Sequence, residues 1–532
     1  MANQLPPVLS PAISVALLVF PFIAGMLILL LPSRFAKRAA LIATLIQAVL
    51  TGYAIYAFNI NMRNSPLMAN EQGIVNIPWI TQFGARFFIG LDGISMLMVI
   101  LTNFLLPLIV LSTWEREFQR QKLFYFLVLM MQGALVGVFV SLDAFLYYIF
   151  WELALIPIYF IILLWGGENR VKVTFKFFIY TLSGSLLMLA GIIWLYLQTP
   201  DGSFGIDAFY ALRVDPAAQR WVFWAFFLAY AIKIPLLPFH SWQPDTYFTA
   251  PGAGTMLLSG IMLKMGIYSI MRWMLPVVPD AVMAYRDLVI ILCIAGIVYA
   301  SWIAMTQKDL KRLFAWSSIA HVGLITAGVF AFSDTRTGFQ GALIQMISHG
   351  TNVVGLFFVV EIIQSRLGTT VLENLGGIRQ KAPVFASVFM VITFASIALP
   401  LTNGFIGEFL LLNALYEHGY WFAAIAGLTI IAGAVYMLRA YKLSMLGESS
   451  DTSVIAESME EIPNGDLPAT AVSSHRKQGF FADLSTSEKL VFFPIVGLIV
   501  FFGIYPQFIF NLTDESVKYL LSEITKHLVP TS

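Results

Sequence analysis

Long apolar runs separated by short polar loops constrain this chain more than any other feature. Fourteen such segments can be drawn, at about residues 12–31, 39–58, 88–112, 123–141, 144–165, 174–197, 219–247, 252–274, 286–305, 312–332, 338–364, 384–417, 420–446 and 488–510. An α-helix of roughly 20 apolar residues crosses the hydrocarbon core of a bilayer, and inside lipid the backbone must satisfy its own hydrogen bonds. The pattern predicts an all-α polytopic membrane protein with about 14 transmembrane helices in a single membrane domain, residues 1–532.

Composition and charge exclude several functions. Apolar residues are 59% of the chain and charged residues 11%, and the net charge of +1 gives no field that would attract nucleic acid. The lone Cys293 can form neither an intrachain disulfide nor a cluster of thiolates, and no glycine-rich phosphate loop or metal-ligand spacing is present. We therefore expect no cofactor and no metal in this chain.

Basic residues are distributed unevenly between the two sets of loops. The loops that follow odd-numbered segments, together with their flanks, hold 20 lysines and arginines, whereas the opposite set, with the chain ends, holds nine. Since cytoplasmic loops are enriched in lysine and arginine, both termini are predicted to be non-cytoplasmic. Residues 447–487, which are acidic and rich in serine, are then a cytoplasmic loop.

Two apolar segments contain a break. Pro235 and Pro238 follow Lys233 and cannot donate helical hydrogen bonds, and Pro400 lies 165 residues after Pro235. The same offset relates helices 4–8 (122–274) to helices 9–13 (286–446), and five helices is an odd number. This indicates two inverted repeats with helices 7 and 12 broken, as in transporters with a site near the midplane. Regular helix lengths in a long membrane protein are the alternative explanation of the offset.

Ionisable side chains inside the apolar segments are the candidate site. A charge at mid-membrane is costly, so each one needs a partner or a function. The glycine- and serine-containing nucleophile motifs of hydrolases are absent. The buried ionisable side chains instead suit proton transfer through a hydrated path. The candidates are Glu152, Lys233, Lys264, His321 and Glu408, with His240, Asp245 and His349 as secondary candidates.

Each candidate has a plainer interpretation. The stem of Lys233 is long enough to carry its ammonium toward the interface, and Lys264 could tether a neighbouring carbonyl. His321 and His349 could be hydrogen-bonded core histidines. Two opposite charges at mid-membrane are costly alone, and so we expect Glu152 and Lys233 to attract one another between helices 5 and 7.

Several motifs resemble a known family. The chain resembles the antiporter-like subunit M (subunit 4) of bacterial respiratory complex I, the NADH–quinone oxidoreductase. This subunit is related to Mrp-type antiporter subunits. The resemblance covers about Gly90 to Leu446. It rests on Phe150-Trp151-Glu152-Leu153, Trp165-Gly166-Gly167, Lys233-Ile234-Pro235, Pro238-Phe239-His240-Ser241-Trp242, Leu263-Lys264-Met265-Gly266, Gln307-Lys308-Asp309-Leu310-Lys311-Arg312, Ala315-Trp316-Ser317-Ser318-Ile319-Ala320-His321-Val322-Gly323 and Asn403-Gly404-Phe405-Ile406-Gly407-Glu408-Phe409.

The resemblance implies a function for the buried charges. In that family the glutamate of helix 5 and the lysine of helix 7 form a coupling pair, the lysine of helix 8 and the histidine of helix 10 continue a hydrophilic axis, and the charge on helix 12 marks the exit side. The chain would then be a proton-translocating subunit of an enzyme whose FMN, iron–sulfur clusters and quinone reduction belong to partner subunits. Its partners would be other membrane subunits, including further antiporter-like ones, in the bacterial inner membrane. A sodium/proton antiporter complex or a membrane-bound hydrogenase is the alternative assembly.

The chain departs from the family pattern at two places. After Pro244-Asp245 it reads Thr246-Tyr247 where the family usually has alanine and histidine, with a glutamate soon after, which weakens any proton-uptake role of this loop beyond Asp245. After Pro400 it has Leu401 where glycine is common, and we therefore expect a gentler second break. The glutamate at position 408, where relatives of the L and N types have lysine, favours the M type.

The last apolar stripe is short. Leu512, Val517, Leu520, Leu521 and Ile524 share one face of a helix predicted at 511–529. We expect this amphipathic helix to lie on the membrane surface or against a neighbouring subunit.

The charge asymmetry makes a prediction about topology. Reporter fusions should place the C-terminus outside the cytoplasm and the 447–487 loop inside it. A reporter at the C-terminus that is active only in the cytoplasm would show that the predicted number of helices is wrong by one.

Overall fold

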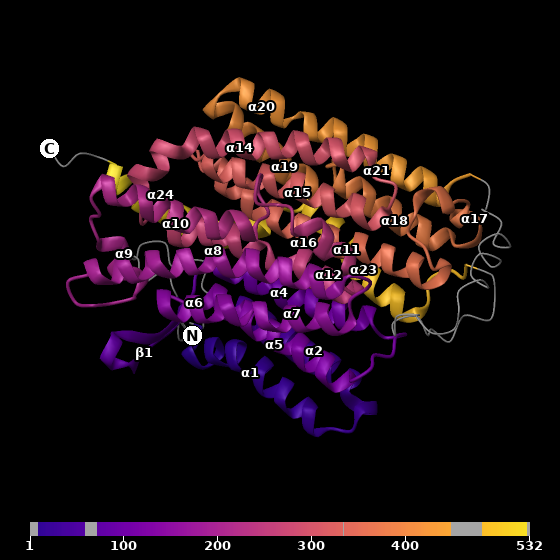
Figure 1. Ribbon diagram of the computed structural model, residues 1–532, viewed down its shortest axis with the longest axis horizontal. Helices are drawn as coiled ribbons and strands as arrows, with labels where there is room; N and C mark the ends of the chain where they lie inside the picture. The colour runs from indigo at the N-terminus through magenta and orange to yellow at the C-terminus, as the bar shows by residue number, and fades with distance from the viewer. Residues whose placement is uncertain (1–8, 59–71, 334, 448–480, 529–532) are drawn as a thin grey trace, which may run out of the picture.

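A computed structural model describes residues 9–58, 72–333, 335–447 and 481–528. Its long helices run side by side along one direction (Figure 1). The hairpin of β1 and β2, the short α9 and the end of α24 lie at the left of Figure 1, which we call the hairpin end. The short α17 lies at the right, which we call the loop end.

The first part of the chain, to residue 274, forms the lower layers in Figure 1. Its elements are α1 (Pro11–Leu30), α2 (Ser33–Ala57), β1 (Gln72–Ile80), the 3-10 turn η1 (Thr81–Phe83), β2 (Ala85–Leu91), α4 (Gly93–Ser112), α5 (Gln121–Val140), α6 (Ala144–Leu153), α7 (Leu155–Trp165), α8 (Arg170–Gln198), α9 (Ile206–Ala211), α10 (Pro216–Lys233), α11 (Gln243–Thr249), α12 (Gly252–Leu257), the π-helix η2 (Leu258–Met262), α13 (Lys264–Ser269) and the π-helix η3 (Ile270–Met274).

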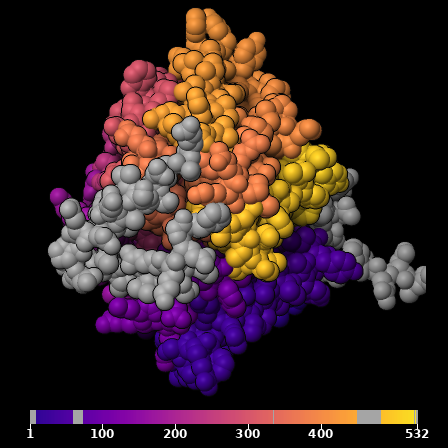
Figure 2. Space-filling view, turned by 90° about the vertical axis from the view of Figure 1, so that its right-hand side faces the viewer, coloured from indigo at the N-terminus to yellow at the C-terminus, as the bar shows by residue number. Residues whose placement is uncertain are grey.

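The second part packs above the first. Its elements are α14 (Pro279–Thr306), α15 (Leu310–Phe330), α16 (Thr337–Leu367), the 3-10 turn η4 (Leu372–Asn374), α17 (Ile378–Lys381), α18 (Pro383–Ser396), α19 (Asn403–His418), α20 (Tyr420–Ala426), α21 (Leu428–Met445), α23 (Thr486–Ile504) and α24 (Gln507–Leu528). Figure 2, which looks at the loop end, shows the N-terminal helices at the bottom, the second part of the chain above them, and residues of the C-terminal helices at one side.

Membrane-crossing helices dominate the structure. In the described ranges, 12 helices are long and apolar enough to cross a membrane, and α18 is a shorter apolar helix. The predicted polytopic all-α membrane protein is thereby confirmed. The 12 helices correspond to the unbroken predicted segments, and the two broken segments, 219–247 and 384–417, are not among them. The count of fourteen crossings and the inverted repeats therefore stay predictions.

The predicted segment 88–112 begins too early. Residues Ala85–Leu91 form β2, which pairs antiparallel with β1, and the helix starts only at Gly93. Asp92 caps the helix, since its side chain accepts from the Ser95 N–H while the Ser95 hydroxyl accepts from the Asp92 N–H. In the sequence, β2 resembles the start of an apolar helix because most of its residues are buried and the alternation of a half-exposed strand is missing.

The first predicted break is present between Lys233 and Gln243. The carbonyl of Ala231 accepts from the Leu236 N–H at 2.8 Å, and the carbonyl of Ile232 accepts from the Trp242 indole at 2.8 Å. Groups of the connecting segment therefore satisfy carbonyls that the prolines leave without helical partners.

The second predicted break is present as well. The helix α18 ends at Ser396 and α19 begins at Asn403, and Leu401 between them has a φ of +70°. This left-handed conformation costs a leucine about 1–2 kcal/mol that a glycine would not lose. The backbone therefore keeps a glycine-like turn with a leucine side chain in it.

The hairpin end holds a buried ion pair. The Arg272 guanidinium lies 2.6 Å from the Asp92 carboxylate, and both side chains are about 95% buried. Arg272 lies within the predicted segment 252–274, and η3 carries its side chain inward. Next to the pair, α24 crosses the start of α4, where a Cβ on Gly93 would lie 2.0 Å from the Leu512 carbonyl oxygen.

The C-terminal helix covers its own chain. Its apolar side chains, Ile509, Leu512, Val517, Leu520 and Ile524, are buried, and α24 packs along α4, α14 and α16. The apolar stripe read from the sequence is therefore largely used within the subunit rather than left for a neighbour.

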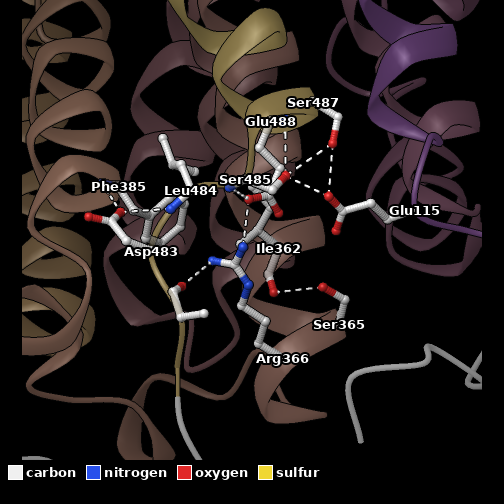
Figure 3. Close-up of polar contacts among 11 residues, drawn as sticks. Glu115, Ile362, Ser365, Arg366, Phe385, Asp483, Leu484, Ser485, Ser487 and Glu488 are labelled. Carbon is white, nitrogen blue, oxygen red and sulfur yellow. Dashed lines mark hydrogen bonds and ion pairs between the residues drawn. The ribbon is translucent and has the colours of Figure 1, made fainter.

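Polar contacts fix the start of α23 at the loop end (Figure 3). The Arg366 guanidinium, near the end of α16, lies 2.5 Å from the Glu488 carboxylate. The Ser485 and Ser487 hydroxyls donate to Glu115, at 2.5 and 2.8 Å. The predicted loop 447–487 lies for the most part outside the described residues, but its final part is held by this cluster.

Candidate functional site

Lys264 lies in an irregular part of its helix. It is fully buried and directly follows the π-helix η2, whose wider turns release a carbonyl. The Lys264 ammonium donates to this carbonyl, that of Ser259, at 2.6 Å, and it lies 2.8 Å from Nδ1 of His349. Lys264 therefore has two partners within the membrane domain, which offsets part of the cost of its charge.

His349 connects Lys264 to the second half of the chain. It lies on α16, and its Nε2 is 3.1 Å from the Ser318 hydroxyl on α15. When the ammonium of Lys264 donates to Nδ1, the neutral imidazole carries its proton on Nε2 and donates to Ser318. The histidine thus accepts on one side and donates on the other.

Glu408 and His321 form the next group. Nδ1 of His321 on α15 lies 3.1 Å from a carboxylate oxygen of Glu408 on α19, which also accepts from the Gln345 amide at 3.2 Å. A Cβ on Gly407 would lie 2.2 Å from the Gln345 side-chain oxygen, so that glycine allows this approach. The rings of His321 and His349 are 5.9 Å apart.

A small cavity joins the two groups. It has about 20 Å³ of room for water, and its lining includes Ser318, His321, Gln345, His349 and Glu408. This is enough for about one water molecule, and the polar lining offers it several partners. We call Lys264, His349, Ser318, His321, Gln345 and Glu408 the central polar cluster.

Lys233 and Glu152 lie apart from this cluster. Lys233 is the last residue of α10 and is 3% exposed, and its ammonium lies 5.2 Å from the centre of the Trp151 ring. Glu152 is near enough to attract it electrostatically, but the described residues contain no ion pair between the two. One Glu152 oxygen is buried without a hydrogen-bond partner. The expected attraction stays a prediction, and the described residues show no direct contact between the two.

The helix that carries Glu152 is itself interrupted. It divides at Ala154 into α6 and α7, three residues before Pro157, which cannot donate to the Leu153 carbonyl. At the hairpin end Asp143 caps α6 and accepts from the backbone of Arg86. Burial raises the pKa of Asp143, although the hydrogen bonds from the backbone oppose this.

No polar contact in the described part of the chain bridges Lys233 and Lys264. Their helices touch where Ile234 packs against Gly266, at which a Cβ would lie 2.5 Å from Ile234 Cγ1. Of the five main candidates, the structure therefore brings together Lys264, His321 and Glu408 and leaves Glu152 and Lys233 as a separate pair.

The secondary candidates are divided in the same way. His240 is buried between the rings of Tyr299 and Trp316, and its Nδ1 has no hydrogen-bond partner. Asp245 is 39% exposed near the loop end and pairs with Lys176 at 3.0 Å and with Arg312 at 3.5 Å. Only His349 joins the central polar cluster.

Two members of the cluster were missed in the sequence. Gln345 precedes His349 by four residues within α16, which places both on one face and is a signal that sequence reading could have used. Ser318 gave no signal of its own, because small hydroxyl residues are common in membrane helices.

Taken together, these features define a polytopic membrane protein with titratable groups buried on several broken helices. Residues 141–432 match the family described as NADH:quinone oxidoreductase/Mrp antiporter, and residues 68–138 match the amino terminus of NADH-ubiquinone oxidoreductase chain 4. The chain belongs to this family, and within it to the subunit M type.

Relatives support the assignment over almost the whole chain. NADH-quinone oxidoreductase subunit M of Rickettsia typhi is 36% identical over 489 residues, which are 92% of each protein. A chain of respiratory complex I from Thermus thermophilus has a TM-score of 0.82 at 27% identity and covers 97% of this chain and 100% of its own. A chain of the Mrp complex from a Dietzia species has a TM-score of 0.80 at 19% identity, covers 98% and 99%, and shares the fold.

The contacts of His349 predict an effect on stability. His349→Leu removes a partner of a buried ammonium and should lower the free energy of unfolding by about 1.5–3 kcal/mol. His418→Leu, at the end of α19 beside Asp287, is the matched control and should have a smaller effect. Thermal unfolding of the purified protein in detergent measures both. Equal stability of His349→Leu and wild type would mean that Lys264 does not need this partner.

Proposed function

We propose that this chain is the antiporter-like, proton-translocating subunit M of an NADH–quinone oxidoreductase. The observation that carries the proposal is the central polar cluster, in which Lys264, His349 and Ser318 form one line of contacts and His321 and Glu408 lie beside it. Four helices, α13, α15, α16 and α19, contribute to it. The identity of 36% with subunit M of Rickettsia typhi supports the assembly.

Proton movement through the cluster follows from its chemistry. A proton released by Lys264 goes to Nδ1 of His349, and the proton on Nε2 leaves toward Ser318 and the cavity. His321 can take it from a water in the cavity and pass it to Glu408, whose carboxylate lies 3.1 Å away. A histidine serves here because one ring nitrogen can accept a proton while the other donates one.

Lys233 and Glu152 act in this proposal as the switch before the cluster. Burial disfavours the charged form of a lysine, and the nearby carboxylate favours it. When Glu152 is drawn away from Lys233, the lysine loses its proton toward Lys264; when Glu152 returns, Lys233 is reprotonated. The packed contact of Ile234 with Gly266 means that water or a small movement has to bridge the two lysines.

The remaining parts of the proposal concern the complex. Redox chemistry, with FMN and iron–sulfur clusters, belongs to other subunits, and further antiporter-like subunits are neighbours in the bacterial inner membrane. In the proposed orientation the loop end, with Asp245 and its basic partners, is cytoplasmic and both termini are not. A sodium/proton antiporter complex is the second candidate assembly, because the fold is shared with the Mrp chain.

Substitutions at the switch test the function. Lys233→Ala should abolish most proton pumping and slow electron transfer while the complex assembles. Lys233→Arg should fail as well, since a guanidinium does not release its proton. Glu152→Gln should be nearly as damaging, and the double variant Glu152→Gln, Lys233→Ala no worse than either if the two residues act as one unit.

Proton uptake by sealed vesicles and the rate of NADH oxidation are the measurements. Lys308→Ala, which removes an exposed lysine paired with Glu373, is the control and should leave both unchanged. Full pumping by an assembled Lys233→Arg complex would contradict proton exchange at this residue and leave it as a fixed charge.

A further inference from the structure

Three buried hydroxyl groups lie on the hairpin-end side of the helix positions of Glu152, Lys233 and Lys264. Tyr147, Tyr230 and Ser269 are each fully buried. They come from α6, α10 and α13, the helices that also carry Glu152, Lys233 and Lys264. Tyr230 precedes Lys233 by one turn, Tyr147 precedes Glu152, and Ser269 follows Lys264, so all three are displaced in the same direction.

Large rings fill the space around these hydroxyls. The Tyr147 ring lies 5.8 Å from that of Trp151 and 5.0 Å from that of Trp273, and the Trp151 ring lies 5.7 Å from that of Tyr230. Trp151 is also the ring over which the Lys233 ammonium lies. We call Tyr147, Trp151, Tyr230, Ser269 and Trp273 the aromatic–hydroxyl cluster.

The line of hydrogen bonds in this cluster ends at a backbone carbonyl. Tyr147 donates to the Ser269 hydroxyl at 2.6 Å, and Ser269 donates to the Met265 carbonyl at 2.6 Å. A backbone carbonyl accepts a hydrogen bond but has no proton to pass on. The Tyr230 hydroxyl lies within reach of the Tyr147 hydroxyl, but among the described residues no hydrogen bond joins Lys233 to any of the three hydroxyls. No hydrogen-bonded line through the described side chains therefore leads from Lys233 across the cluster.

A second barrier follows toward the hairpin end. Arg272, three residues after Ser269, is held by Asp92 at 2.6 Å, and its backbone carbonyl accepts from the Tyr210 hydroxyl at 2.7 Å. A guanidinium keeps its proton at all physiological pH values, so it is not a relay.

We propose that the aromatic–hydroxyl cluster is a barrier that stops protons on Lys233 from escaping directly to the hairpin end. Protons on Lys233 then leave toward Lys264, across the contact of Ile234 with Gly266 that water or a small movement has to bridge. This inference rests on the proposed function, because a barrier at Lys233 matters only if protons reach that residue. The large rings block the path of water and protons, and the hydrogen bond of the Tyr147 hydroxyl to Ser269 holds its ring in place.

A pair of substitutions separates a barrier from a relay. Tyr147→Ala removes a ring and opens space for water, and it should raise passive proton conductance several-fold while NADH oxidation continues. Tyr147→Phe keeps the ring and removes the hydroxyl, and should leave conductance and pumping as in the wild type. A relay predicts the reverse, with Tyr147→Phe pumping poorly and no leak in either variant.

The experiment uses the assembled complex in liposomes that contain a pH-sensitive dye. Dissipation of an imposed pH step is recorded without NADH, so the leak is measured independently of pumping. Phe502→Ala, a buried aromatic residue on α23 away from the cluster, is the control and should not leak. Trp273→Leu is a second test of ring size and should also leak.

The double variant Tyr147→Ala, Lys233→Ala ties the leak to Lys233 and should conduct less than Tyr147→Ala. An assembled Tyr147→Ala complex and a Trp273→Leu complex that both stay proton-tight would overturn the barrier. Normal pumping by Lys233→Ala would instead overturn the proposed function, and the leak of Tyr147→Ala would then persist in the double variant.

Discussion

The cost of a charge inside hydrocarbon determines most of what this structure does. A lysine or glutamate at mid-membrane is unfavourable by several kcal/mol unless it has partners. The chain meets this cost at Lys264 with a released carbonyl and an imidazole, and at Arg272 with Asp92. At Lys233 it does so less completely, with an aromatic ring and a carboxylate beyond contact distance. The least satisfied charge is thus the one best suited to lose its proton.

Irregular helices make these partners available. In the interior of a regular helix each carbonyl already accepts a backbone N–H, so only its second lone pair is left for a buried ammonium. The π-helix before Lys264 releases the Ser259 carbonyl, and the break after Lys233 ends a helix at the charge, where its C-terminal carbonyls favour a cation. The break before α19 similarly brings Asn403 and Glu408 toward α16, where Ser348 donates to the Asn403 carbonyl at 2.9 Å.

Much of this architecture could be predicted from the sequence, because apolar length and buried charge are local signals. The two breaks followed from prolines, and Lys264 and Glu408 from their apolar neighbours. The hairpin strand Ala85–Leu91 was missed since an apolar strand and the start of an apolar helix look alike. Arg272 was not among the candidates because it lies near the end of its segment, where a basic residue is common. Leu401 shows the opposite limit: the backbone turn is kept although the expected glycine is absent.

The position of His349 in the central polar cluster was also beyond the sequence, since a histidine on an apolar face has several ordinary explanations, and its partners Lys264 and Ser318 are on other helices. Long-range placement of this kind depends on how α13, α15 and α16 pack, which no local pattern specifies. The same holds for the aromatic–hydroxyl cluster, whose members are far apart in the chain and individually unremarked core residues.

The most direct measurement of the central claim is the number of protons moved per NADH oxidised by a complex that carries Lys264→Met. Methionine has a similar length and no charge, so packing in the helix is largely kept. If protons travel through the central polar cluster, the assembled variant should move fewer protons per NADH or turn over more slowly, while its flavin and iron–sulfur subunits stay intact. An unchanged proton ratio at an unchanged rate of NADH oxidation would contradict the account.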